Sequence, residues 1–219
     1  MYTPAMFKTD HAASLAFAEA RGFATVCAFD GEKPVASLLP FYISHADDGT
    51  PLALFHLARG NPLIQLADGK TSWLLAVSGP DAYVSSDWYV SADQVPTWLY
   101  QAVHLTGPVR RLSDAELTVQ IDTLSAKFEN RLAPKKPWTS AKMTPGRLEA
   151  MKKAIVGLVM CVVEVEGSFK LNQHKSEADF AAVAGALAAQ RDAGSQQIAG
   201  LMRQTRPQAF APVTESQKS

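Results

Sequence analysis

The chain has 219 residues, of which 47% are hydrophobic and 19% are charged, and its formal net charge is zero. This is globular composition, which excludes a largely disordered chain, and the length suffices for one sizeable core or a core with a helical appendage. No apolar run reaches the roughly 18 residues of a membrane helix, so we expect no membrane partner.

The N-terminal sequence lacks the charged start and apolar centre of a signal peptide, which favours a cytoplasmic protein over an exported one. Cys27 and Cys161 are flanked by apolar residues, a pattern typical of buried, reduced thiols.

Charge is uneven along the chain. Between Gly107 and Lys153 there are 10 Lys and Arg against 5 Asp and Glu, a local excess of 10 − 5 = +5.

The first half of the chain is strand-rich. A short helix is predicted after Thr9-Asp10 and should end at Gly22. The predicted strands, with a short helical stretch at 61–69 between the third and fourth, are 23–29, 34–43, 51–57, 72–79, 81–86 and 96–107. Turns are expected at Asp30-Gly31 and Asp48-Gly49, and Gly79-Pro80 signals a hairpin or bulge.

The hydrophobic period changes after the last of these strands. Ser113 and Glu116 form a capping-box pattern that opens a helix within 113–132. The remaining predicted segments are a basic Pro-rich loop (132–146), a brief helix (147–153), one apolar strand (155–167), a helix capped by Ser176, a second helix (195–205) and a polar tail from Arg206. This order of strands and helices predicts a mainly β fold: a small antiparallel barrel with α decoration and C-terminal helices.

Several standard catalytic arrangements are missing. The sequence contains no GxGxxG, GxxxxGK[ST], GxSxG or HExxH motif, and its five histidines show no ligand spacing. We therefore assign no metal site and no catalytic residue.

Three segments remain as candidates for binding. Trp98, Tyr100 and His104 share one face of the strand at 96–107, which indicates either core or interface packing or a pocket for a planar ligand. The segment FHLARGNP (55–62) places Arg59 beside a probable helix start, either as a phosphate anchor or as a surface arginine in a turn. The segment FKLNQHKS (169–176) gathers amides and cations, either as a phosphate clamp or as a solvated loop.

These segments occur together in a recognisable order. The stretches MYTPAMFKTD, FHLARGNP, GPDAYVSSDWY, VPTWLYQAVHLTG and AIVG with FKLNQHKS resemble the PaiB-like family of FMN-binding negative transcriptional regulators, from Met1 to about Ala189. That family belongs to the FMN-binding split-barrel superfamily, with the pyridoxamine-phosphate oxidases. This chain departs from the common motifs at Leu99, where the family often has Asn, and at Asn172 and His174.

The resemblance implies an FMN-binding split β-barrel that forms a homodimer with its flavin pockets at the subunit interface. It implies a barrel domain at 1–175 with the inserted helix 113–132, a helical extension at 176–205 and a polar tail at 206–219. By analogy with the oxidases, FMN would be held by residues that anchor its phosphate, border its ring or close its site. These are His56, Arg59 and Asn61 for the phosphate, Trp98 and His104 for the ring, and Lys170 and Gln173 for closure.

The resemblance also implies a function. The favoured hypothesis is a flavin-binding transcriptional repressor with little or no catalysis of its own. The alternative is an FMN-dependent oxidoreductase similar to the pyridoxamine-phosphate oxidases, in which the flavin would carry the chemistry. No helix-turn-helix pattern stands out, so DNA contact would fall to the basic loop LAPKKPW and the excess of positive charge across 107–153, doubled in a dimer.

Overall fold

The computed structural model describes residues 1–211, which divide into two compact units that are treated separately below. The barrel unit consists of His11–Val77 and Val103–Glu166. The terminal unit consists of Met1–Asp10, Ser78–Ala102 and the described residues from Gly167 onward. Within residues 1–211, no helix is long and apolar enough to cross a membrane.

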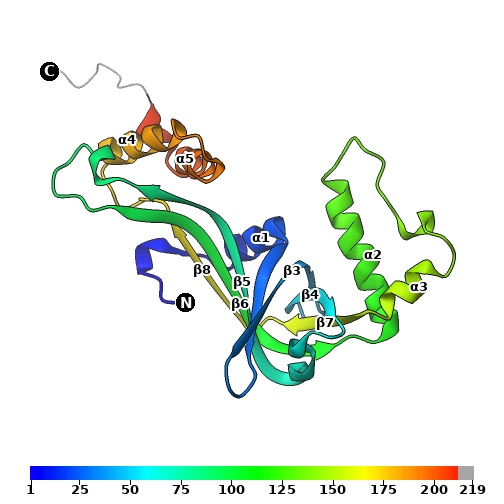
Figure 1. Ribbon diagram of the computed structural model, residues 1–219. Coiled ribbons are helices and arrows are strands. Elements are labelled where there is room, and N and C mark those ends of the chain that lie inside the picture. The colour runs from blue at the N-terminus through cyan, green and yellow to red at the C-terminus, as the bar shows by residue number, and fades with distance from the viewer. Residues whose placement is uncertain (212–219) are drawn as a thin grey trace. The chain divides into compact units, whose positions relative to one another are not determined.

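The described chain contains eight strands and five α-helices (Figure 1). The strands are β1 (Lys8–Thr9), β2 (Phe23–Phe29), β3 (Pro34–His45), β4 (Pro51–Ala58), β5 (Asp68–Val84), β6 (Thr97–Arg111), β7 (Ile155–Cys161) and β8 (Glu164–Lys170). The α-helices are α1 (His11–Arg21), α2 (Asp114–Asn130), α3 (Arg147–Lys152), α4 (Glu177–Ala188) and α5 (Ala193–Thr205). The 3-10 helices are η1 (Ala5–Phe7), η2 (Pro62–Leu66), η3 (Ser86–Trp88), η4 (Ser140–Lys142) and η5 (Pro207–Phe210).

The barrel unit closes because its strands pair in a ring. β2 pairs with β3, β3 with β4, β4 with β7 and β7 with β6, all antiparallel, and β5 lies between β6 and β2. Both predicted turns are present. The Asp30 carboxylate accepts a hydrogen bond from the Lys33 amide at 2.8 Å, and the Asp48 carboxylate accepts one from the Thr50 amide at 2.9 Å. The predicted antiparallel barrel is therefore confirmed.

Large side chains from the inner faces of these strands fill the barrel unit. Those that are at most 1% exposed include Phe41, Phe55, Trp73, Leu75, Leu105, Leu158 and Met160. The rings of Phe55 and Trp73 lie 6.4 Å apart between centroids. Full burial of a side chain of this size contributes about 1.5–3 kcal/mol, so the alternating apolar pattern of the strands is what stabilises the barrel.

Helix α2 packs against β7. The predicted capping box is present, because the Ser113 hydroxyl accepts from the Glu116 amide at 3.3 Å and the Glu116 carboxylate accepts from the Ser113 amide at 2.8 Å. Leu117 on α2 is buried. A Cβ atom at Gly157 of β7 would lie 3.0 Å from the Leu117 side chain, so the glycine allows the helix to approach the strand closely.

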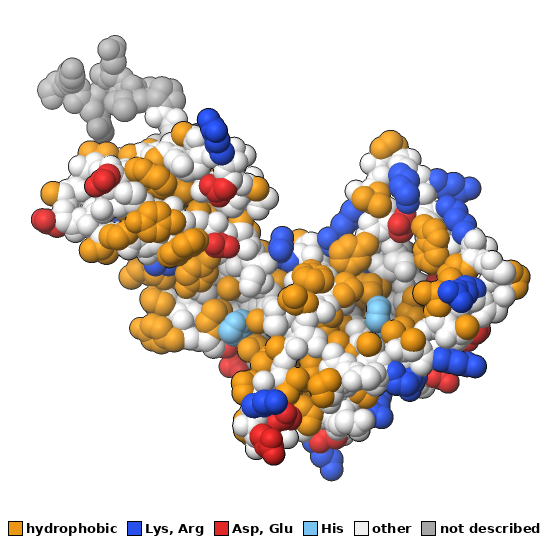
Figure 2. Space-filling view, viewed as in Figure 1, with side chains coloured by type: hydrophobic (Ala, Val, Ile, Leu, Met, Phe, Trp, Pro, Cys, Tyr) orange, Lys and Arg blue, Asp and Glu red, His pale blue; other side chains and the backbone are white. Residues whose placement is uncertain are grey.

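The chain between α2 and α3 is the predicted Pro-rich basic loop. We call residues 131–153 the basic segment; Figure 2 shows Lys and Arg side chains gathered over it. Lys135 pairs with Glu129, whereas Lys136 and Arg147 have no ion pair within residues 1–211.

The terminal unit has its own hydrophobic core around α4 and α5. Its fully buried members are Val84, Leu99, Phe180, Val183, Ala184, Leu187, Ile198 and Met202. Ser176 caps α4 as predicted, since its hydroxyl accepts from the Asp179 amide at 3.2 Å, and Asp192 caps α5 in the same way through the Ser195 amide. β1 pairs with β8 at the edge of this unit.

Two predictions about strands are wrong. The strands predicted at 72–79 and 81–86 are one strand, β5, so Gly79-Pro80 forms no hairpin, and the alternative of a bulge stays a prediction. The pairing of β5 with β2 ends at Ala76, so the missing N–H of Pro80 breaks no bond to β2. The apolar run 155–167 forms two strands instead of one. After β7 the Val162 amide bonds to the Pro51 carbonyl and the Val163 amide bonds to the Thr106 carbonyl, which interrupts the strand.

Three further predictions have mixed outcomes. Cys27 and Cys161 are free thiols, but both are partly exposed instead of buried. The compact units do not follow the predicted boundary at residue 175, because residues 1–10 and 78–102 group with the C-terminal helices. Of the predicted tail, Pro207–Phe210 form η5, and residues 212–219 lie outside the described chain.

Gly107 in β6 offers a test of the barrel's closure. A Cβ atom at this position would lie 1.8 Å from the Cys161 carbonyl oxygen. We expect Gly107→Ala to lower the free energy of unfolding by about 3 kcal/mol, because the pairing of β6 with β7 must shift, as urea denaturation would measure. The control is Gly185→Ala on an exposed face of α4, which should raise stability by roughly 0.5–1 kcal/mol. An unchanged urea midpoint for Gly107→Ala would contradict the close approach.

Candidate functional site

His56 lies on β4 with its imidazole against α2. Its Nδ1 atom is 3.4 Å from Nε2 of Gln120, which is fully buried and whose Oε1 atom has no hydrogen-bond partner among the described residues. Burial lowers the pKa of His56 below its ordinary value, and the contact with Gln120 opposes this only in part. His56 is therefore a neutral imidazole held in place by a buried amide. Gln120 was missed in the sequence, although it lies between Leu117 and Leu124 on the apolar face of α2.

Arg59 follows β4 and is bound to the start of β7. Its Nε atom donates to the Lys153 carbonyl at 2.6 Å and its Nη2 atom to the Ile155 carbonyl at 3.0 Å, while its backbone amide donates to the Ala154 carbonyl. The side chain is exposed and has no carboxylate partner within residues 1–211. These bonds fix the guanidinium plane and leave Nη1 for an anion, since a guanidinium has five N–H donors.

The side chain of Asn61 is fully engaged. Its Oδ1 atom accepts from the Leu63 amide at 3.0 Å, which caps η2, and its Nδ2 atom donates to the Ser37 hydroxyl at 2.7 Å. Asn61 therefore positions the segment after β4 and offers a ligand little of its own side chain. Its contact with Ser37 on β3 joins residues 24 positions apart, which no local pattern indicates.

Along β6 the burial alternates strictly. Val103 and Leu105 face the core at 0% exposure, whereas His104 is half-buried on the other face, as the period of two predicts. Burial lowers the pKa of His104 below its ordinary value. His104 therefore presents a neutral imidazole on the outer face of this strand.

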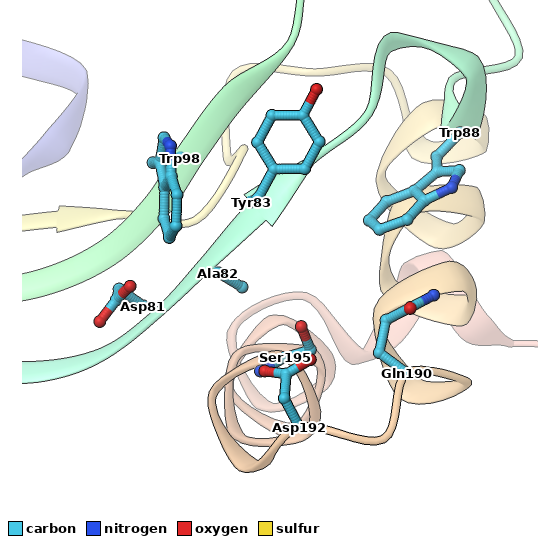
Figure 3. A pocket seen from close by; sticks show the side chains of 8 residues that line it. All are labelled: Asp81, Ala82, Tyr83, Trp88, Trp98, Gln190, Asp192 and Ser195. Atoms are coloured by element: carbon cyan, nitrogen blue, oxygen red, sulfur yellow. The ribbon is translucent and has the colours of Figure 1, made fainter.

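Trp98 lines an aromatic cavity of about 470 Å³ in the terminal unit (Figure 3). Its ring meets that of Tyr83 edge-on, with 6.1 Å between centroids, and Trp88 stands beside them. Asp192 and Ser195, at the start of α5, lie on the opposite side. Exposed aromatic rings around a hollow suit a planar ring system, whereas the carboxylates make this cavity unfavourable for a phosphate.

Lys170 lines a different cavity of the terminal unit. Its Nζ atom donates to the Thr97 hydroxyl at 2.6 Å and lies 5.9 Å above the centre of the Phe7 ring. Thr97 and Trp98 are neighbours on β6, so their side chains point to opposite faces of the strand. The structure therefore does not bring Lys170 and Trp98 into one cavity of the same chain.

Gln173 ties the end of β8 to the N-terminal segment. Its Oε1 atom accepts from the Leu171 amide at 2.7 Å, and its Nε2 atom donates to the carbonyls of Phe169 and Met6 at 2.6 and 3.0 Å. Both ends of the amide are thus engaged within the chain. Gln173 acts as a positioning residue in this structure.

Comparison with known proteins agrees with this architecture. A family model described as "Putative FMN-binding domain" matches residues 1–164. The chain is 34% identical over 203 residues to the Bacillus subtilis protein named "Protease synthase and sporulation protein PAI 2", covering 92% of this chain and 96% of that protein.

Two solved structures share the fold at low sequence identity. The FAD- and heme-binding protein of Mycobacterium smegmatis aligns over 74% of this chain and 72% of its own, with a TM-score of 0.52 and 17% identity. A conserved hypothetical protein of Mycobacterium tuberculosis aligns over 77% and 90%, with a TM-score of 0.52 and 12% identity. At these identities the likeness concerns the fold alone.

The closed antiparallel barrel, in a chain that matches a family model for FMN-binding domains, defines a flavin-binding split-barrel protein. This chain belongs to the PaiB-like family of FMN-binding proteins, as its motifs predicted, and its cofactor is FMN. The described residues fit that cofactor in two respects. The Arg59 guanidinium has no carboxylate partner within residues 1–211 and can bind a phosphate, and the aromatic cavity around Trp98 can take a planar ring.

The buried imidazole of His56 makes a prediction about pH. The pKa of His56 is lowered in the folded protein, so below about pH 6.5 the unfolded chain takes up this proton more readily than the folded one. The stability contributed by neutral His56 is therefore lost as the pH falls through that value. We expect the free energy of unfolding to fall between pH 7.5 and 5.5, and to fall less in His56→Asn, as urea titrations at each pH would measure.

The control for this experiment is Gln204→Asn, which changes an exposed side chain without a titratable group and should keep the pH dependence of the wild type. Residual dependence in His56→Asn is expected from His104 and His174, whose pKa values are also lowered, in both cases first by burial. Identical pH profiles for His56→Asn and the wild type would show that the imidazole is not held neutral by its surroundings.

Proposed function

We propose that the protein is a homodimeric, FMN-binding negative regulator of transcription that acts in the cytoplasm and has little or no catalysis of its own. The observation that carries this proposal is the similarity to the B. subtilis sporulation protein. It extends over 92% of the chain, beyond the end of the family model at residue 164. FMN supplies a bound, reversibly reducible ligand, and its binding would bias the dimer between regulatory states.

The phosphate of FMN is assigned to the segment after β4. Arg59 is held by two backbone carbonyls, which leaves its charge uncompensated and its plane fixed. A guanidinium in a fixed orientation loses less conformational entropy on binding a phosphate than a free one does. In this proposal His56 and Asn61 hold the same segment in place, through Gln120 and Ser37 respectively.

The flavin ring is assigned to the outer face of β6. Trp98 is 54% exposed although it is the largest side chain on its strand, and Tyr83 beside it is 48% exposed. Large aromatic side chains that are exposed side by side mark a surface that a ligand or partner can cover. We propose that Trp98, in the terminal unit, stacks on the ring. The part given to His104, in the barrel unit, rests on the family resemblance alone. Lys170 and Gln173, proposed from the sequence to close the site, contribute by holding the end of β8.

The assignment of Arg59 to the phosphate predicts a difference between two flavins. Arg59→Gln should weaken FMN binding by about tenfold to a hundredfold, because a charge-assisted hydrogen bond to the phosphate is lost. Binding of riboflavin, which lacks the phosphate, should change little. Fluorescence titration of flavin-free protein with each ligand would measure both dissociation constants.

Two variants serve as controls for this experiment. Arg147→Gln removes an exposed arginine on α3 and should bind both flavins as the wild type does. Trp98→Ala should weaken FMN and riboflavin equally, since it removes a contact to the ring that the two share. Equal losses for both flavins in Arg59→Gln would refute the phosphate assignment, and a wild type that binds neither would refute the flavin-binding function.

Contact with DNA is assigned to the basic segment. Lys136 and Arg147 have no ion pair within residues 1–211, and a homodimer would carry this segment twice. Phosphate contacts release counterions, so binding to duplex DNA should weaken steeply as salt rises. Each of Lys136→Gln and Arg147→Gln should reduce the salt slope by about one per chain, whereas Lys33→Gln at the β2–β3 turn should not. Absent or salt-independent binding would instead favour regulation through a partner protein.

A further inference from the structure

The cavity that Lys170 lines combines basic and aromatic side chains. It measures about 350 Å³ and is formed wholly within the terminal unit, by the N-terminal segment, the start of β6 and the turn between β8 and α4. Phe7 and Tyr89 are among its walls, together with Thr97. Its size falls within the range of small-molecule sites, and it has aromatic walls with a few polar groups.

Three basic side chains line this cavity, and no acidic one does. They are Lys170, His174 and Lys175. Lys170 donates to the hydroxyl of Thr97, and Lys175 donates to the Oε1 atom of Gln94 at 2.6 Å, so each ammonium group has a neutral partner. An ammonium group has three N–H donors, and each of these bonds uses one. The cavity therefore carries positive charge that no described side chain neutralises.

Burial raises the pKa of Tyr89, a wall of this cavity, and the charge of the Asp179 carboxylate adds a smaller effect in the same direction. That carboxylate accepts hydrogen bonds from the amides of Val90 and Ser91 and from the hydroxyls of Ser91 and Ser176. It is buried and does not line the cavity. Asp179 thus holds the loop after η3 and leaves the lysine charges uncompensated.

The imidazole of His174 completes the basic set. It meets the ring of Phe7 edge-on, with 5.4 Å between centroids. The pKa of His174 is lowered, first by burial and then by the charges of Lys175 and Lys170. Three like-charged or chargeable groups around one hollow repel one another, and a bound anion would relieve that repulsion.

A rigid backbone frame holds these groups. Asn172, between the two lysines, has a left-handed φ of 60° and is 1% exposed, and its Nδ2 atom donates to the Tyr89 hydroxyl at 3.1 Å. The Lys175 amide donates to the Asn172 carbonyl at 2.9 Å, and Arg206 binds the Lys175 carbonyl at 2.8 Å. The cations are therefore presented by a fixed turn, which lowers the entropic cost of binding a ligand.

We propose that this cavity binds a second ligand, an aromatic or heterocyclic phosphate monoester, at a site other than that of the flavin. Two ammonium groups and an imidazole match the double negative charge of a phosphate monoester, and Phe7 and Tyr89 contact its ring. The site is distinct from the aromatic cavity because Thr97 and Trp98 point to opposite faces of β6.

Phenyl phosphate is the probe for this site. We expect it to bind the full-length protein in calorimetric titrations, and to bind equally well when the protein is saturated with FMN. Phenol has the aromatic ring but no phosphate, and inorganic phosphate has no ring. Each should bind at least tenfold more weakly than phenyl phosphate. In Lys175→Gln the dissociation constant should rise about tenfold or more, and Lys33→Gln at the exposed β2–β3 turn is the matched control with an unchanged value.

A second variant distinguishes a loss of ligand contacts from a local loss of structure in Lys175→Gln. His174→Gln keeps the size of the side chain and removes only the chargeable ring, and it should also weaken phenyl phosphate while leaving the melting temperature unchanged. Failure of phenyl phosphate to bind the wild type would overturn the proposal. Equal affinity in Lys175→Gln, or displacement of phenyl phosphate by FMN in a one-to-one ratio, would overturn it as well.

Discussion

The double pairing of β7 is the constraint on which the barrel unit depends. Along one edge β7 pairs with β4 over seven residues, and along the other it pairs with β6 near Val109. The last residue of β7, Cys161, passes so close to β6 that only glycine fits at position 107. This pairing also sets the candidate phosphate anchor, because the carbonyls that orient Arg59 belong to the residues just before β7 and at its start.

Polar side chains in this protein divide between those that hold the chain and those that remain available for ligands. Asn61 and Gln173 use both ends of their amides within the protein. Arg59, Lys170 and Lys175 bind neutral partners and keep an uncompensated charge. An amide both donates and accepts, so its two ends are readily used by the backbone, whereas a cation with three to five N–H groups can bind the fold through one or two of them and still attract an anion.

The terminal unit separates two kinds of binding surface. One cavity combines three aromatic side chains with carboxylates, and the other combines aromatic walls with three basic groups. The separation follows from the geometry of β6, since Thr97 and Trp98 are adjacent in sequence and project to opposite faces. The aromatic rings of one cavity and the uncompensated charges of the other therefore lie toward different faces of the same strand.

The sequence by itself determined the local features of this protein and its family. The capping boxes and turns, such as Ser113 with Glu116 and Asp30 with Gly31, depend on residues a few positions apart, so their patterns could be read directly. The tertiary structure decided the rest. Only the pairing of distant strands splits 155–167 into β7 and β8, and only packing places Gln120 against His56, 64 positions away. Long-range contacts of this kind leave no periodic signal, and for that reason the sequence could name Lys170 and Trp98 together although the fold gives them different cavities.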